Sequence, residues 1–169
     1  PYSSQEEQQA ENLRKMLIAM AEDIRVIIIK LADRLHNMRT IECMEPQKRR
    51  DKARENMEVY APIAHRLGIR TIKEELEDLS LKYLDPVAYK EIEDELELGK
   101  DDREHLLAII KRRIKQKLSP VIPDLHLEGR VKSINGIYRK VFIKNRLMEE
   151  IYDIYAVRVI VNTVNDCYN

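Results

Sequence analysis

The stretch IIIKLADRLHNMRT, residues 27–40, decides how the first half of this sequence folds. Apolar residues recur at helical spacing from Ile24 to about Ile41, and extra apolar positions widen the stripe around the helix. The second half of the stretch adds an aspartate, a histidine and an asparagine. The pattern predicts a central, largely buried helix that begins after Asp23 as its cap and carries a polar stripe.

The polar stripe has a spacing that suits a ligand. Asp33 and Asn37 are four residues apart and Thr40 lies three further on, so all three share one helix face. A carboxylate in apolar surroundings needs a cation or several hydrogen bonds, and a divalent metal would satisfy it. An ion pair from Asp33 to Lys30 or Arg34 is the alternative. The residues alone favour that alternative, because one aspartate cannot hold a catalytic metal.

Helical patterns continue on both sides of this stretch. Ser4 and Glu7 form a capping box ahead of a first amphipathic helix. Pro46 suits the first turn of a helix that ends at Gly68 and that Pro62 should kink. Three more helices are predicted over residues 71–83, 86–98 and 101–118. The last changes from acidic to basic along its length, which complements the helix dipole.

Beyond Asp124 the pattern changes to that of an α/β domain. The segment 125–132 (LHLEGRVK) precedes a helical pattern over residues 133–145, and residues 154–161 (IYAVRVIV) are rich in β-branched residues and predict a buried strand. Arg and Lys side chains at the end of the first strand and on the following helix suit a triphosphate. From the residues alone, an ordinary basic helix face is the safer interpretation.

Composition limits the class of protein. Of the 169 residues 44% are hydrophobic, and 30 basic residues balance 30 acidic ones, so net charge indicates neither direct DNA binding nor a membrane partner. Cys43 and Cys167 lack the spacing of a disulfide framework or a zinc site. The N-terminus is unlike a signal peptide. We expect a cytoplasmic protein and, since no initiator Met is present, a fragment of a longer one.

Four motifs, in order, resemble one family. KLADRLHNMRT (residues 30–40) and MEVYAPIAHRLGI (57–69) resemble the hydrolase region of the RelA/SpoT homologues, which make and degrade the alarmone (p)ppGpp in the bacterial stringent response. GRVKSINGIYRK (129–140) and YDIYAVRVIVN (152–162) resemble the start of their synthetase domain. The resemblance implies a mainly α chain. Residues 1–84 would be the C-terminal part of an all-helical HD-type hydrolase domain, 85–120 a helical connector, and 121–169 the start of an α/β nucleotidyltransferase-like synthetase domain.

For the hydrolase the resemblance implies a manganese site. Asp33 matches the last metal-ligand aspartate, and Asn37 and Thr40 match positions beside the bound nucleotide. His36 and His65 have no metal role in the family pattern and are expected to be structural, His65 as a packed helix residue. The family's other metal ligands and its Glu-Asp pair would precede residue 1.

For the synthetase the resemblance implies a magnesium site and an ATP site. Asp153 matches the magnesium-binding aspartate, and the ATP-binding positions are Gly129, Arg130, Lys132 and Lys140. Asn135 and Gly136 stand where the family usually shows a Tyr-Ser pair, which predicts altered substrate binding. The family's catalytic glutamate and guanine-binding tyrosine would follow Asn169.

Together these matches imply a parent enzyme that is both a GTP pyrophosphokinase and a guanosine-3′,5′-bis(diphosphate) 3′-pyrophosphohydrolase. Its partners would be ATP, GDP, GTP and (p)ppGpp, with the ribosome contacted only through C-terminal regions absent here. The connector would couple the two sites, and this chain alone would be inactive. Two alternatives stay open: a monofunctional synthetase with a decayed hydrolase, and a non-catalytic helical interaction module.

Overall fold

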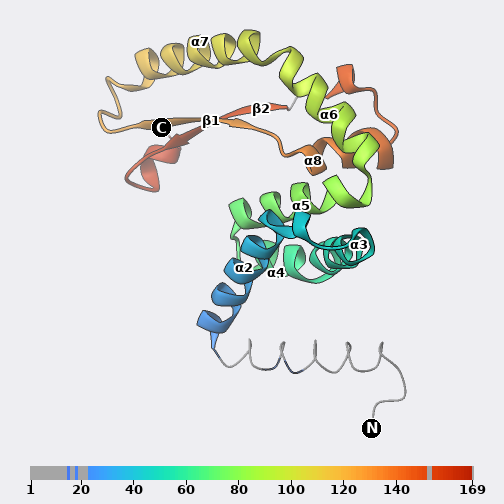
Figure 1. Ribbon diagram of the computed structural model, residues 1–169. Helices are drawn as coiled ribbons and strands as arrows, with labels where there is room; N and C mark the ends of the chain where they lie inside the picture. Colours follow the sequence, from blue (N-terminus) through green and yellow to red (C-terminus); the bar gives the residue numbers. More distant parts are fainter. Residues whose placement is uncertain (1–14, 16–17, 19–22, 152–153, 169) are drawn as a thin grey trace. The chain divides into compact units, whose positions relative to one another are not determined.

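The computed structural model describes residues 15, 18, 23–151 and 154–168 (Figure 1). The capping box at Ser4 and most of the first predicted helix lie outside these residues. The chain forms two compact units, residues 1–84 and residues 85–169. Helices dominate both units and the second adds a two-stranded sheet, so the prediction of a mainly α chain that opens an α/β region is confirmed. Among the described residues no helix is long and apolar enough to cross a membrane.

The first unit is built from helices that begin and end where the sequence predicts. Its elements are α2 (Ile24–Arg39), the 3₁₀ turn η1 (Ile41–Cys43), α3 (Pro46–Glu55), the π-helical turn η2 (Asn56–Tyr60), α4 (Ala61–Arg66) and α5 (Arg70–Leu84). The Asp23 side chain accepts a hydrogen bond from the Arg25 backbone N–H, which caps α2. Gly68 adopts a φ of 72° between α4 and α5, a conformation that glycine accepts without strain.

Pro62 changes the helix in a different way from the predicted kink. It cannot donate a hydrogen bond, and its ring crowds the carbonyl four residues earlier. The chain widens into the π-helical turn η2 just before it, where the Ala61 N–H donates to the Asn56 carbonyl five residues back. Helical structure therefore runs without interruption from α3 through η2 into α4.

The core of the first unit lies against one face of α2. Leu31, Leu35 and Met38 are buried there, and they join buried residues of η1, α3, η2, α4 and α5. Ile24 and Ile29 are 57% and 67% exposed. The prediction of a helix buried on most sides is therefore wrong within the described residues, because α2 packs chiefly against α5 and the turns η1 and η2.

The second unit carries the only sheet among the described residues. Its main elements are α6 (Pro86–Leu98), α7 (Lys100–Leu118), β1 (His126–Val131), α8 (Ile134–Tyr138), the π-helical turn η3 (Arg139–Ile143) and β2 (Tyr155–Ile160), with short 3₁₀ turns η4 (Met148–Glu150) and η5 (Asn165–Cys167). Strands β1 and β2 pair antiparallel. A small core forms around Ile92, Ile137 and Ile151. The prediction of a buried second strand is wrong, since Val159 and Ile160 of β2 are about 40% exposed.

Candidate functional sites

The polar stripe of α2 faces solvent. Asp33, Asn37 and Thr40 are all exposed, and the spacing of the first two places them on one face of the helix. The Thr40 hydroxyl donates to the His36 carbonyl at 3.1 Å and so closes the end of α2. Within the described part of the chain the Asp33 carboxylate has no hydrogen bond or ion pair. This carboxylate is therefore available to a ligand.

Arg34 pairs with Glu55 and not with Asp33, so the alternative of an ion pair between Asp33 and Arg34 is wrong. The Arg34 side chain is only 12% exposed, and its guanidinium grips the Glu55 carboxylate through two hydrogen bonds of 3.1 and 3.2 Å. It also donates to the Tyr60 hydroxyl at 2.9 Å, and its central carbon lies 4.3 Å from the centre of that ring. These contacts hold α2 against α3 and η2 at the residue next to Asp33.

A buried amide lies in the π-helical turn. Asn56 is fully buried, and neither polar atom of its side chain has a hydrogen-bond partner among the residues that the structure describes. A buried, unpaired amide destabilises a fold, and π-helical turns occur often near functional sites. No sequence pattern marks this residue, because an asparagine in a polar helix usually faces solvent.

The described residues alone do not complete a metal centre. No group of three or more His, Cys, Asp or Glu side chains is placed to hold a metal ion among them. Asp33 therefore offers one carboxylate and no more. His36 is exposed, and so is His65, which means that the prediction of a packed His65 is wrong.

The strand β1 has two chemically different faces. Side chains alternate along it, and the register pairs Glu128 with Arg158 and Gly129 with Val157. Glu128 forms an ion pair with Arg158 at 3.5 Å, and Arg130 lies on that same polar face. Gly129 lies on the other, apolar face. The structure thus separates two neighbouring residues that the resemblance assigns to one ATP site.

The remaining basic positions follow β1. Lys132 lies one residue beyond the strand, where its backbone N–H donates to the Ile154 carbonyl at 2.8 Å. Lys140 lies half-buried in η3. The Ser133 hydroxyl between them accepts the Gly136 N–H at 3.2 Å and caps α8. Asp153, the predicted magnesium ligand, lies outside the described residues.

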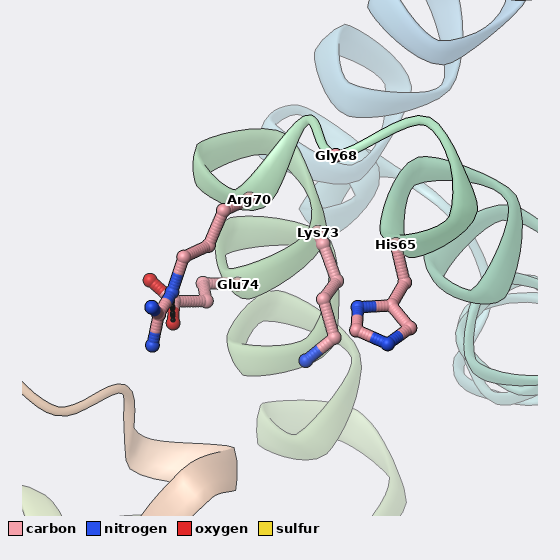
Figure 2. A pocket seen from close by; sticks show the side chains of 5 residues that line it. All are labelled: His65, Gly68, Arg70, Lys73 and Glu74. Atoms are coloured by element: carbon pink, nitrogen blue, oxygen red, sulfur yellow. Dashed lines mark hydrogen bonds and ion pairs between the residues drawn. The ribbon is translucent and has the colours of Figure 1, made fainter. Parts of the chain in front are cut away.

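A surface pocket that the sequence did not predict lies in the first unit. The pocket has a volume of about 440 Å³ and is lined by His65 of α4, by Gly68 of the turn and by three residues of α5, whose side chains extend to one side of that turn (Figure 2). Arg70 pairs with Glu74 at 2.8 Å, and Lys73 pairs with Glu77 at the same distance. Each cation therefore has its own carboxylate, and the sequence shows only ordinary helical ion pairs four residues apart.

Comparison with known proteins decides the family. The family model "HD domain" matches residues 2–70, and the model "Region found in RelA / SpoT proteins" matches residues 129–169. A Synechocystis protein named "Probable guanosine-3′,5′-bis(diphosphate) 3′-pyrophosphohydrolase" is 48% identical over 168 residues, which cover 99% of this chain and 22% of that protein. The chain belongs to the RelA/SpoT family.

Other RelA/SpoT relatives carry both kinds of name. The Escherichia coli K12 "Bifunctional (p)ppGpp synthase/hydrolase SpoT" is 45% identical over 99% of this chain and 24% of its own length. A "GTP pyrophosphokinase" of Streptomyces coelicolor is 46% identical over 95% of this chain and 19% of its own length. The chain thus spans about a fifth to a quarter of these relatives. Helix α2 falls in the HD match. Strand β2 and the last three residues of β1 fall in the second match, and α6 and α7 lie between the two matches.

Proposed function

We propose that this chain is part of a bifunctional alarmone enzyme. One activity hydrolyses (p)ppGpp with water to GDP or GTP and pyrophosphate. The other transfers pyrophosphate from ATP to the 3′-hydroxyl of GDP or GTP and leaves AMP. The observation that carries the proposal is the order of two matched regions in a single chain, hydrolase-type before synthetase-type, each with an exposed or basic set of residues suited to phosphate chemistry.

In the hydrolase half, Asp33 would supply one carboxylate ligand to a manganese ion, and Asn37 and Thr40 would lie beside the nucleotide. The exposed, unpaired carboxylate of Asp33 and the shared face of Asn37 support this assignment. A bound divalent metal activates water and neutralises phosphate charge. Arg34 does not face the ligand in this proposal; its contacts to Glu55 hold the helix that presents Asp33.

In the synthetase half, Arg130, Lys132 and Lys140 would bind the ATP phosphates, while Asp153 would hold magnesium. Arg130 can grip phosphate oxygens as a fork, and the two lysines add point charges. Gly129 belongs to the same strand but lies on its other face. Pyrophosphate transfer depends largely on such stabilisation of phosphate charge.

The test uses the complete gene product with radiolabelled nucleotides. Hydrolysis of (p)ppGpp is measured with manganese, and synthesis from ATP and GDP with magnesium. Asp33→Asn should abolish hydrolysis and leave synthesis within a factor of about two, whereas Arg130→Gln should do the reverse. Asp51→Asn and Arg112→Gln are matched controls, because both side chains are exposed and lie outside the proposed sites.

The outcomes separate the candidate functions. Synthesis without any hydrolysis by the unsubstituted protein would support a monofunctional synthetase. No metal-dependent binding of guanine nucleotides would overturn the enzyme proposal in favour of a helical interaction module.

The connector α6–α7 would couple the two sites. Guanine-nucleotide affinity at one site should therefore change when a non-hydrolysable analogue fills the other, and by reciprocity each ligand should change the other's affinity equally. Independent affinities would overturn this part of the proposal.

A further inference from the structure

Gly129 lies directly beneath a side chain of α7. A Cβ atom placed on Gly129 would lie 3.0 Å from both Cε and Nζ of Lys111 and 3.5 Å from Cδ1 of Leu107. The first two separations are tighter than ordinary van der Waals contacts, and the third is normal. Glycine at this position therefore makes room for one particular lysine.

Leu107 and Lys111 are four residues apart, so both extend from the same face of α7 toward the sheet. Helix α7 packs against both strands in this unit. Lys111 is half-buried, and within the described part of the chain its ammonium has no hydrogen bond or ion pair. Its contribution is therefore the packing of its aliphatic stem across the bare backbone of Gly129.

Arg130 is the neighbour of Gly129 and lies on the opposite face of β1. Any displacement of the strand from α7 would therefore move the Arg130 side chain on the far side. A two-stranded ribbon has little stability of its own and takes its position from what it packs against.

We propose that Lys111 and Gly129 form a positioning pair that sets the placement of Arg130 in the ATP site. The proposal rests on the synthetase function proposed above. It gives Gly129 a role through α7 instead of through contact with ATP, and it names the point at which the connector can alter ATP binding.

The direction in which Gly129→Val changes ATP binding distinguishes this proposal from what strand propensity alone predicts. Glycine weakens a strand interior, and Val opposite Val157 should strengthen the pairing. A Cβ at Gly129 requires the tip of Lys111 to move by a few tenths of an ångström. If the positioning pair exists, the lysine does not give way, and Gly129→Val displaces the strand and weakens ATP binding. Shortening the lysine should then relieve the damage, because only Leu107 would remain near the new side chain.

The experiment measures the KM for ATP and the kcat of synthesis in the complete gene product, with a double-mutant cycle. Gly129→Val should raise the KM for ATP roughly fivefold with kcat within about twofold, and Lys111→Ala should remove most of that rise. Lys111→Met keeps an unbranched stem, so it should leave the defect in place. Lys115→Ala, an exposed lysine one turn along α7, is the matched control and should relieve nothing.

Equal rises in KM with Lys111 and with Ala at position 111 would overturn the proposal, because the effect of Gly129→Val would then not depend on the lysine. An unchanged KM in Gly129→Val would overturn it as well. Absence of synthesis by the unsubstituted protein would instead overturn the proposed function. The midpoints of thermal unfolding, measured without nucleotide, would still decide the packing contact: non-additive midpoints support it and additive midpoints reject it.

Discussion

Helix α2 and strand β1 both carry residues of the proposed sites, but the two elements are held in place in different ways. The buried face of α2 is fixed by Leu31 and Met38, which are at most 1% exposed, and by the bidentate grip of Arg34 on Glu55. Strand β1 has one paired neighbour, β2, whose Val159 and Ile160 are about 40% exposed. The proposed metal ligand on α2 is thus placed by a core, whereas the basic groups of β1 are placed by a two-stranded ribbon and one covering helix.

This difference implies that the position of β1 can shift more easily than the position of α2. A packed helix has few alternative positions, because a close-packed core resists small changes of shape. A two-stranded ribbon moves with the helix that covers it. We therefore expect substitutions behind α2 to affect the stability of the unit, and substitutions under β1 to affect ligand binding more than stability.

The largest effect should come from the core of α2. Leu31→Ala removes a fully buried side chain, and the free energy of unfolding should fall by about 2–5 kcal/mol in urea unfolding of the chain. Val159→Ala in β2, at 38% exposure, should cost less than about 1 kcal/mol. Equal losses in the free energy of unfolding at the two positions would contradict the proposed difference between the packing of α2 and that of the sheet.

Arg34 should be the next most important residue. Arg34→Met removes two hydrogen bonds to Glu55, one to Tyr60 and the contact with the tyrosine ring, and we expect a loss of about 1–3 kcal/mol. Arg39→Met is the matched control on the same helix. Arg39 also grips a glutamate with two hydrogen bonds, but both partners are 40% or more exposed, so its loss should stay below about 1 kcal/mol.

A comparable loss in the two arginine variants, read from chemical unfolding, would show that burial of Arg34 adds nothing. A hydrolase readout sharpens the test. If Arg34 holds α2 in place, Arg34→Met should weaken manganese binding in the complete gene product, and Arg39→Met should not.

Asn56 offers a substitution that should stabilise the first unit. Asn56→Ala removes two buried polar atoms without partners and improves helix propensity, so the free energy of unfolding should rise by about 1 kcal/mol. Asn37→Ala on the exposed face of α2 is the control: it gains helix propensity alone, and so measures that contribution without the removal of a buried polar group. A thermal midpoint that falls in Asn56→Ala would contradict this expectation, and would mean that the cavity left behind or a partner of the amide, such as a buried water, outweighs the gain.

The sequence predicted the helix ends well because local chemistry decides them. Asp23, Pro46, Gly68 and Asp85 each act within one turn of their own position, as caps or as the first helical residue. The stripe of Asp33 and Asn37 followed from spacing alone in the same way. Its exposure did not, since the apolar residues around it do not reveal which of them another element will cover.

The failures share a physical cause, which is contact between residues distant in sequence. Arg34 meets Glu55 and Tyr60 across more than twenty residues, and Lys111 meets Gly129 across eighteen. No local sequence pattern predicts these long-range contacts. The exposure of β2 belongs to the same class, because a run of β-branched residues predicts a strand but not what covers it.

The smallest expected effect concerns Tyr138, which holds α8 to the start of α6. Its hydroxyl donates to the Asp85 carboxylate at 3.3 Å, and its ring stacks on Phe142. Burial and the nearby Asp85 charge raise the pKa of Tyr138 above its ordinary value of 10.0. Since the folded pKa exceeds the unfolded one, the stabilisation is complete below about pH 10 and is lost as the pH rises through the folded pKa.

Tyr138→Phe should therefore remove a pH dependence as well as a hydrogen bond. Near pH 8 the loss in the free energy of unfolding should be about 1 kcal/mol or less, and the two proteins should converge as the pH rises above 10. Urea unfolding at each pH measures the difference, which cancels the titration of the other tyrosines. Tyr168→Phe, at 87% exposure, should show no such convergence. Curves for Tyr138→Phe and the unsubstituted chain that coincide at every pH would mean that the hydroxyl of Tyr138 contributes nothing to the attachment of α8, and that Ile137 and the stacked ring on Phe142 hold it alone.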